Sequence, residues 1–235
     1  MREGTARPDL TILSGRFGSG KTETAINLAL SLARDRGIKG ARPSCPVILI
    51  DLDIVTPYFR SRETADRIRA FGVQVIAPSI IGQHLDTPAI TPQILGAIQQ
   101  SDRRVVLDVG GDKQGARALG QFSDAIRQRG YAMLFVVNPY RPFTDTLQGL
   151  ADSVAEIQAS ARLEVTGLVS NPNLIGETSI EGIINGHAKL EGFAQALGLP
   201  IDFVCIERRW TDDLESNQFK QPMLTLDRHF TMSWE

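Results

Sequence analysis

A glycine-rich segment near the start of the chain constrains the fold more than any other feature. Residues 14–22 read SGRFGSGKT and fit the pattern G-x-x-x-x-G-K-[ST] at each fixed position: Gly15, Gly20, Lys21 and Thr22. An apolar run precedes this segment at residues 10–13, and a helical pattern follows it at residues 24–33. In such a strand–loop–helix unit, the backbone N–H groups surround a phosphate, the lysine adds positive charge and the hydroxyl can bind Mg²⁺.

This context favours a nucleotide-phosphate site over a plain glycine turn between a strand and a helix. Lys21 and Thr22 are the residues that a turn alone would not require. The expected nucleotide contacts are nearly consecutive in the chain: Gly15, Phe17, Gly18, Ser19, Gly20, Lys21, Thr22 and Glu23.

Composition sets the class of protein. The 235 residues are 42% apolar and 22% charged, which is ordinary for a globular protein, and the net charge of −2 makes no strong case for a nucleic-acid partner. Cys45 and Cys205 lie far apart, which suggests buried thiols in a reducing compartment. The N-terminus lacks the apolar segment of a signal peptide, and no apolar run approaches the roughly 20 residues of a membrane span. We therefore expect a cytoplasmic protein.

Alternating strand and helix patterns continue along the chain and predict one α/β domain, 1–235, with a mostly parallel sheet flanked by helices on both faces. Its core is expected at residues 9–206, with a C-terminal extension at 207–235. Strands are expected at 10–13, 47–50, 73–77, 104–108, 132–137, 165–171 and 200–206. Helices are expected at 24–33, 61–71, 90–100, 116–129, 144–161, 180–197 and, as a short acidic helix, 212–217.

Carboxylates follow or end two of the expected strands. Asp51 and Asp53 come after the apolar run 47–50, and alternation places them on the same side of an extended backbone. Asp108 ends another apolar run and begins a D-x-x-G pattern with Gly111, whose amide is expected to sense a terminal phosphate. Ligands of parallel sheets bind at this edge, where a carboxylate can hold the Mg²⁺ shell. The alternative for a single aspartate is a helix cap or a turn.

Other polar residues lie at the same expected edge. Asn171 closes the strand 165–171 and is either a contact to a purine edge or a turn former before proline. Two proline-containing loops carry Tyr58, Arg60, Tyr140 and Arg141, whose arginines suit a carboxylate or phosphate but could equally cover surface. His84 is interpreted as a solvated loop residue, and His187 and His229 as structural residues.

The order of these elements resembles the P-loop ATPases of the MinD/ParA type, a deviant Walker A group of the SIMIBI class that also holds nitrogenase iron protein and cobyrinic acid amidases. The resemblance covers roughly residues 9–206 and implies a P-loop NTPase fold, ATP and Mg²⁺. That family's loop reads K-G-G-x-G-K-[ST], and its first lysine reaches a partner's phosphates across a dimer. Arg16 stands at that lysine here, and Phe17 stands at a glycine.

Carried over residue by residue, the resemblance implies catalytic roles for Lys21, Asp53 and Arg16. Asp53 would orient the attacking water, and Arg16 would act as a cation in trans. The Mg²⁺ shell would involve Thr22, Asp51 and Asp108, and Asn171 would contact adenine. N-K-x-D, the usual guanine-reading motif, is absent from the sequence.

Two functions follow from these residues. The first is a nucleotide-dependent switch, a slow ATP hydrolase controlled by a homodimer or an unknown protein partner. The second is an ATP-dependent enzyme that activates a small molecule, an amide ligase or kinase, with its acceptor near Tyr58, Arg60, Tyr140 and Arg141. A non-enzymatic scaffold is a third option, but the chain makes no strong case for membrane binding, because it lacks a long basic amphipathic helix at its C-terminus.

Overall fold

A computed structural model of the chain describes residues 8–34, 45–52, 62–77, 92–215 and 217–229. These residues form one eight-stranded sheet in the order β3-β2-β4-β1-β5-β6-β7-β8, and every neighbouring pair of strands is parallel. The strands are β1 Leu10–Ser14, β2 Val47–Leu52, β3 Val73–Ile76, β4 Arg104–Val109, β5 Ala132–Val137, β6 Gly167–Ser170, β7 Ile201–Glu207 and β8 Met223–Leu226. The predicted α/β class and parallel sheet are confirmed.

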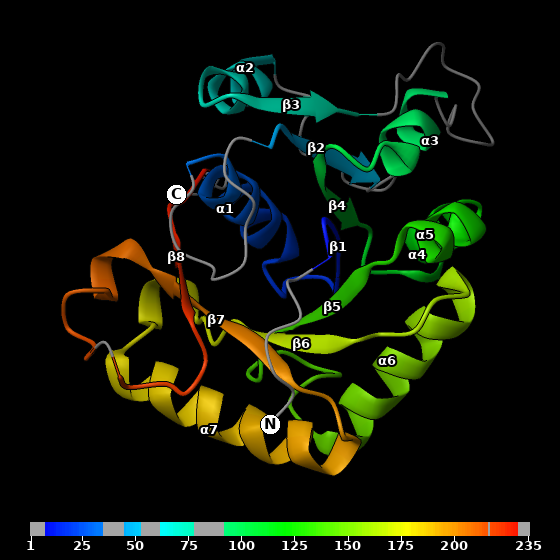
Figure 1. Cartoon of the computed structure of the whole chain (residues 1–235). Coiled ribbons are helices and arrows are strands. Elements are labelled where there is room, and N and C mark those ends of the chain that lie inside the picture. Colours follow the sequence, from blue (N-terminus) through cyan, green and yellow to red (C-terminus); the bar gives the residue numbers. More distant parts are fainter. Residues whose placement is uncertain (1–7, 35–44, 53–61, 78–91, 216, 230–235) are drawn as a thin grey trace.

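Helices cover both faces of this sheet (Figure 1). They are α1 Lys21–Ala33, α2 Arg62–Ala70, α3 Pro92–Gln99, α4 Lys113–Gly120, α5 Ser123–Arg129, α6 Leu147–Ala161 and α7 Ile180–Leu197. Helices α1 and α2 share one apolar cluster with the sheet, whereas α3 to α7 pack on the opposite face. No helix among the described residues is both long enough and apolar enough to cross a membrane.

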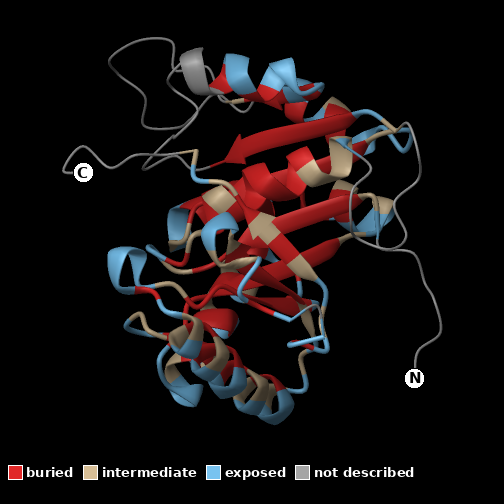
Figure 2. Cartoon of the chain, turned by 90° about the vertical axis from the view of Figure 1, so that its left-hand side faces the viewer, coloured by how far each residue is buried: buried red, intermediate tan, exposed pale blue. Residues whose placement is uncertain are grey.

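The central strands are buried along their whole length, as Figure 2 shows. Every residue of β1, β2, β4 and β5 is buried. Parallel strands covered on both faces read as continuous apolar runs rather than as alternating ones, and this is why their positions were predictable. The polar exceptions, including Asp51 and Asp108, are confined to a few positions in these strands.

Two expected elements were wrong. The helix expected at 116–129 is two helices, α4 and α5, which meet at Gln121 and Phe122. Phe122 is buried in the core there, and Gly120 lies so close to α6 that a Cβ on it would be 3.0 Å from the Ser160 carbonyl oxygen. The chain therefore bends to fit both residues against the neighbouring packing.

The acidic helix expected at 212–217 is absent from the described part of that segment. A 3-10 turn, η3 Arg208–Trp210, and further turns lead instead to β8, a strand that the sequence did not predict. β8 pairs in parallel with β7, and its Leu224 and Leu226 are buried in the cluster that contains α1. Asn27 of α1 fixes the end of this strand, since it accepts from the Asp227 N–H and donates to the Asp227 carbonyl, both at 2.9 Å.

Candidate functional site

The loop between β1 and α1 has a backbone that only glycine adopts easily. Gly15, Gly18 and Gly20 have φ angles of 154°, 77° and 82°. Gly20 is the residue before α1, and no side chain caps the helix there. The first N–H groups of a helix need partners and carry its positive partial charge, so an anion at this end would satisfy them.

Two neighbouring backbone segments, at the end of β5 and after β4, lie in close contact with this loop. A Cβ on Gly15 would lie 2.5 Å from the Val136 carbonyl oxygen of β5. A Cβ on Gly111, the D-x-x-G glycine after β4, would lie 2.3 Å from the Gly15 carbonyl oxygen. Glycine at both positions therefore permits backbone-to-backbone contact. The predicted phosphate sensor Gly111 touches the phosphate loop itself.

The residues expected to bind a metal lie on the face of the sheet that α1 covers. Asp51 of β2 and Asp108 of β4 are register partners in neighbouring strands, and both are buried. Their strand neighbours Leu49 and Val106 belong to the apolar cluster that contains α1. Alternation along each strand therefore directs both carboxylates to the α1 side.

The first turn of α1 provides Lys21 and Thr22, both buried. The hydroxyl oxygen of Thr22 is buried and has no hydrogen-bond partner among the described residues. A hydroxyl without a partner among the described residues, on the same side of the sheet as two buried carboxylates, fits a hard cation such as Mg²⁺, which prefers oxygen ligands and keeps several waters or phosphate oxygens. No group of three or more His, Cys, Asp or Glu that could hold a metal occurs within the described ranges.

Asn171 fixes the loop from the side of β6. Its side-chain Nδ2 donates to the Ser19 carbonyl oxygen at 2.7 Å, and its backbone N–H donates to Val137 at 2.9 Å. A Cβ on Gly20 would lie 2.2 Å from that Nδ2 atom, so the amide closely adjoins the start of α1. The predicted adenine contact of Asn171 stays a prediction. The contact to Ser19 positions the loop.

Arg16 is bound within its own chain. Its Nε donates to Ser153 Oγ at 2.9 Å and its Nη2 donates to Glu156 Oε2 at 2.7 Å, both on α6. Its guanidinium also lies 5.5 Å from the ring centre of Phe143. A role in trans would require the guanidinium to leave these partners, and this role stays a prediction.

The loop after β5 carries the other predicted residues of this edge. Tyr140 donates its hydroxyl to the Gly182 carbonyl of α7, and burial raises the pKa of the Tyr140 phenol above its usual value. Arg141 lies beside the phosphate loop, with its Nε 3.6 Å from the position of a Cβ on Gly18. Of the two, Arg141 is therefore the one that reaches the phosphate loop.

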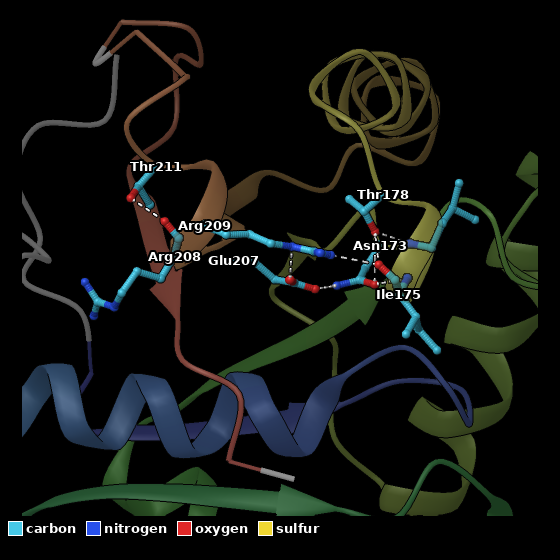
Figure 3. A network of polar contacts seen from close by, with 8 residues as sticks. Asn173, Ile175, Thr178, Glu207, Arg208, Arg209 and Thr211 are labelled. Atoms are coloured by element: carbon cyan, nitrogen blue, oxygen red, sulfur yellow. Dashed lines mark hydrogen bonds and ion pairs between the residues drawn. The ribbon is translucent and has the colours of Figure 1, made fainter. Parts of the chain in front are cut away.

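A polar network holds the neighbouring loop after β6 (Figure 3). Asn173 Nδ2 donates to Glu207 Oε1 at 2.7 Å, and Arg209 Nε pairs with Glu207 Oε2 at 2.8 Å. Asn138, at the end of β5, donates to the Asn173 carbonyl at 2.6 Å. These contacts join the carboxyl ends of β5, β6 and β7, so the edge next to the phosphate loop is cross-linked.

Several predicted residues lie outside the described residues. They are Asp53, Tyr58, Arg60 and His84. Sequence reasoning in turn missed Ser153 and Glu156, which bind Arg16 from 137 and 140 residues away along the chain. Their spacing of three places them on one face of a helix, but nothing in the sequence relates that face to Arg16.

Several solved proteins have a fold similar to that of this chain. FtsY, the cell division protein of Thermotoga maritima, is 20% identical with a TM-score of 0.51, and the match covers 86% of this chain and 63% of that protein. Chloroplast FtsY from Physcomitrella patens is 20% identical with a TM-score of 0.51, and the match covers 86% of this chain and 59% of that protein. The signal recognition particle receptor FtsY from Elizabethkingia anophelis, solved in complex with GDP, is 16% identical with a TM-score of 0.51. That match covers 88% of this chain and 60% of that protein.

These neighbours decide the fold. It is a P-loop NTPase fold. The chain spans about three fifths of the length of these solved proteins. No protein-family model matches the chain, and no curated protein sequence matches it. The similarity to these structures shows the fold alone, so the SIMIBI class and its MinD/ParA subgroup both stay predictions.

Proposed function

We propose that this protein is a nucleotide-dependent switch that binds ATP with Mg²⁺ and hydrolyses it slowly under the control of a partner. The observation that carries the proposal is the uncapped start of α1, preceded by glycines with positive φ and followed by buried Lys21 and Thr22. The carboxylates of Asp51 and Asp108 lie on the same face of the sheet as this helix. A phosphate and a divalent cation together match that arrangement of donors and acceptors.

Each side chain of the site has a proposed task. Lys21 provides a positive charge next to the loop N–H groups, and both neutralise phosphate oxygens. Thr22 and Asp108, with Asp51 beside them, would hold Mg²⁺, which when bound neutralises charge that develops during phosphoryl transfer. Asp53 is proposed to orient the attacking water, and the role of Arg16 as a cation in trans stays a prediction. Catalysis would thus rest on positioning and electrostatics.

The choice of ATP rests on the MinD/ParA resemblance and on the missing N-K-x-D pattern. The FtsY neighbour in complex with GDP makes a guanine nucleotide the alternative. Both nucleotides offer the same phosphates to the loop, so the base decides between them. Binding of both must therefore be measured.

Two exposed aromatic residues support control by a partner. Phe17, within the phosphate loop, is 76% exposed, and Phe143, which stacks near Arg16, is 66% exposed. Exposed aromatic side chains next to a ligand site are typical of interaction surfaces. A nucleotide-dependent homodimer or another protein would cover these two aromatic side chains. The compartment that we expect for the protein is the cytoplasm.

Nucleotide binding tests the proposal directly. Titration of fluorescent ATP and GTP analogues, with Mg²⁺ or with EDTA, should show metal-dependent binding that is tighter for ATP. Lys21→Ala should weaken binding about 100-fold or more, because buried charge-assisted contacts to phosphate are lost. Thr22→Ala should reduce the difference between Mg²⁺ and EDTA. No binding of either nucleotide at millimolar concentration would overturn the proposal.

Turnover separates the switch from the ligase or kinase. A switch should hydrolyse ATP slowly without other substrates. ADP release that depends on an added metabolite would instead favour an acceptor pocket at Arg141 and the residues Tyr58 and Arg60. Fast hydrolysis by the purified protein alone would contradict control by a partner.

A further inference from the structure

Arg141 lies against the part of the phosphate loop that faces solvent. Its Nε, Cδ and Cζ atoms are 3.6, 3.9 and 3.9 Å from the position of a Cβ on Gly18, and Gly18 is exposed. Because residue 18 is a glycine, with a φ of 77°, the loop presents its backbone and no side chain there. The guanidinium therefore adjoins the backbone of the glycine-rich loop that is proposed to bind phosphate.

The side chain of Arg141 has hydrogen-bonding capacity left over. Its Nε is buried and has no hydrogen-bond partner among the described residues. Its backbone, in contrast, is fixed, because its N–H donates to the Asn138 carbonyl at 3.1 Å and its carbonyl accepts from Thr144 N at 3.2 Å. A guanidinium on a fixed backbone with an unused buried donor suits an anionic ligand.

The Nε of Arg16 has a hydrogen-bond partner, whereas the Nε of Arg141 has none among the described residues. The Nε and Nη2 of Arg16 bind Ser153 and Glu156, so its charge is already neutralised by a carboxylate of its own chain. Arg16 and Arg141 therefore differ in the hydrogen-bond donors and the positive charge that are available to bind a phosphate.

The partners of Arg16 also fix the loop that carries Arg141. Ser153 is fully buried, accepts from Arg16 and donates to the Phe143 carbonyl at 3.3 Å. Phe143, two residues after Arg141, has a φ of 68°, a left-handed conformation that a bulky residue rarely adopts without support. Arg16 thus connects the phosphate loop with the backbone next to Arg141.

We propose that Arg141 contacts the nucleotide phosphates in cis, and that Arg16 acts as the positioning residue that holds the Arg141 loop in place. This assignment rests on the proposed nucleotide site. It gives the site a second cation from its own chain, whatever its oligomeric state. The ligand class is the polyphosphate part of a nucleoside di- or triphosphate.

The experiment compares Arg141→Ala, Arg141→Lys and Arg16→Ala with Arg69→Ala, an exposed arginine on α2 that pairs with Asp66. Dissociation constants are measured for ATP, ADP and inorganic tripolyphosphate, which has no base. Arg141→Ala should weaken each about tenfold or more, the scale of a lost charge-assisted contact, and Arg141→Lys should restore part of it. Arg69→Ala should bind as the wild type does.

The double variant Arg16→Ala/Arg141→Ala tests the positioning role. If Arg16 acts through Arg141, Arg16→Ala weakens binding less than Arg141→Ala and adds nothing to it in the double variant. Equal affinity of Arg141→Ala and Arg69→Ala for tripolyphosphate would overturn the proposal. So would an additive loss in the double variant, which would make Arg16 an independent phosphate contact.

The same experiments distinguish a failure of the proposed nucleotide binding from a failure of the role assigned to Arg141. If the wild type binds ATP and Lys21→Ala does not, the nucleotide site stands, and only the Arg141 variants judge the second cation. Thermal unfolding without ligand completes the design. A lowered melting temperature of Arg141→Ala with unchanged affinity would show a structural residue and overturn the assignment.

Discussion

The two sides of the phosphate loop are built in different ways. On the side of β2 and β4, the candidate ligands Asp51 and Asp108 are part of the strands, and strand pairing places them next to each other. On the side of β5 and β6, Asn171 and Arg141 follow the strands. A long-range side-chain bond to Ser19 fixes Asn171, and bonds within its own loop fix the backbone of Arg141. The acidic side thus depends on sheet register, whereas the basic side depends on loops. We expect the acidic side to tolerate little change and the basic side to be adjustable.

The largest effect is expected on the acidic side. Asp108→Asn keeps the shape of a fully buried side chain but removes its charge. If Asp108 supports Mg²⁺, metal affinity in the presence of nucleotide should fall about 10- to 100-fold, the usual cost of losing a supporting ligand. Metal-free nucleotide binding should change little. Titration of Mg²⁺ at fixed ATP measures this. Asp102→Asn is the control, because Asp102 precedes β4 by two residues and so lies beyond the opposite end of that strand. Equal Mg²⁺ affinities in the two variants would contradict the assignment.

The next effect tests how Asn171 holds the loop. Gly20→Ala places a Cβ 2.2 Å from Asn171 Nδ2 at a φ of 82°, so it combines backbone strain with displacement of the amide. Each contribution is about 1 kcal/mol, and together they should lower the free energy of unfolding by about 2 kcal/mol. In an Asn171→Ala background only the backbone strain remains.

Urea denaturation of the two single variants and the double variant measures this coupling. The double variant should be about 1 kcal/mol more stable than the sum of the single effects predicts. Strict additivity would show that the amide moves away from Gly20 without loss. In that case the bond from Asn171 to Ser19 would not restrain the loop.

Sequence patterns predicted the acidic side better than the basic side, for a physical reason. The apolar runs of β2 and β4 mark buried parallel strands, and alternation then directs Asp51 and Asp108 to one face. The glycine-rich motif similarly located the phosphate loop and the start of α1. These features are local, so a short stretch of sequence contains them.

The remaining features depend on partners far away in the chain. Nothing near Arg16 indicates Ser153 and Glu156, and nothing near Arg141 indicates that it would lie beside Gly18. The strand β8 has only four residues, and its place depends on β7 and on Asn27 of α1. The break between α4 and α5 likewise reflects contact of Gly120 with α6. Tertiary packing decided each of these.

A smaller effect concerns pH on the basic side. His187 of α7 is buried, with Nδ1 3.1 Å from Ser170 Oγ at the end of β6 and Nε2 3.2 Å from Gln221 Oε1. Burial lowers the pKa of His187, while Glu191 and the Gln221 contact raise it and Lys220 lowers it. Below about pH 6.5, His187 binds a proton more readily in the unfolded chain than in the folded one. Its contribution to the free energy of unfolding is therefore complete above that pH and is lost as the pH falls.

Melting temperatures between pH 5 and 7.5 measure this dependence. His187→Gln, which keeps a donor for Gln221, should show a smaller loss of stability at pH 5 than the wild type. His229 is the matched control, because burial also lowers its pKa but it lies beside Asp227 and α1, away from β6. If only His229→Gln reduced the pH dependence, protonation would act at the C-terminal edge and not at the side that holds Asn171.

The smallest effect concerns the ion pair that joins the phosphate loop to α6. Arg16 and Glu156 are 23% and 27% exposed, and ion pairs near the surface contribute about 0.5 kcal/mol to stability. Glu156→Gln should lower the free energy of unfolding by about that much, and the difference from the wild type should shrink in high salt because ions screen it. Asp124→Asn is the control, since Asp124 is fully exposed and pairs with Arg127, which is 50% exposed. A loss above about 2 kcal/mol would place the pair among buried, structure-determining contacts. The basic side would then be as rigid as the acidic one, and the contrast between the two sides of the loop would no longer hold.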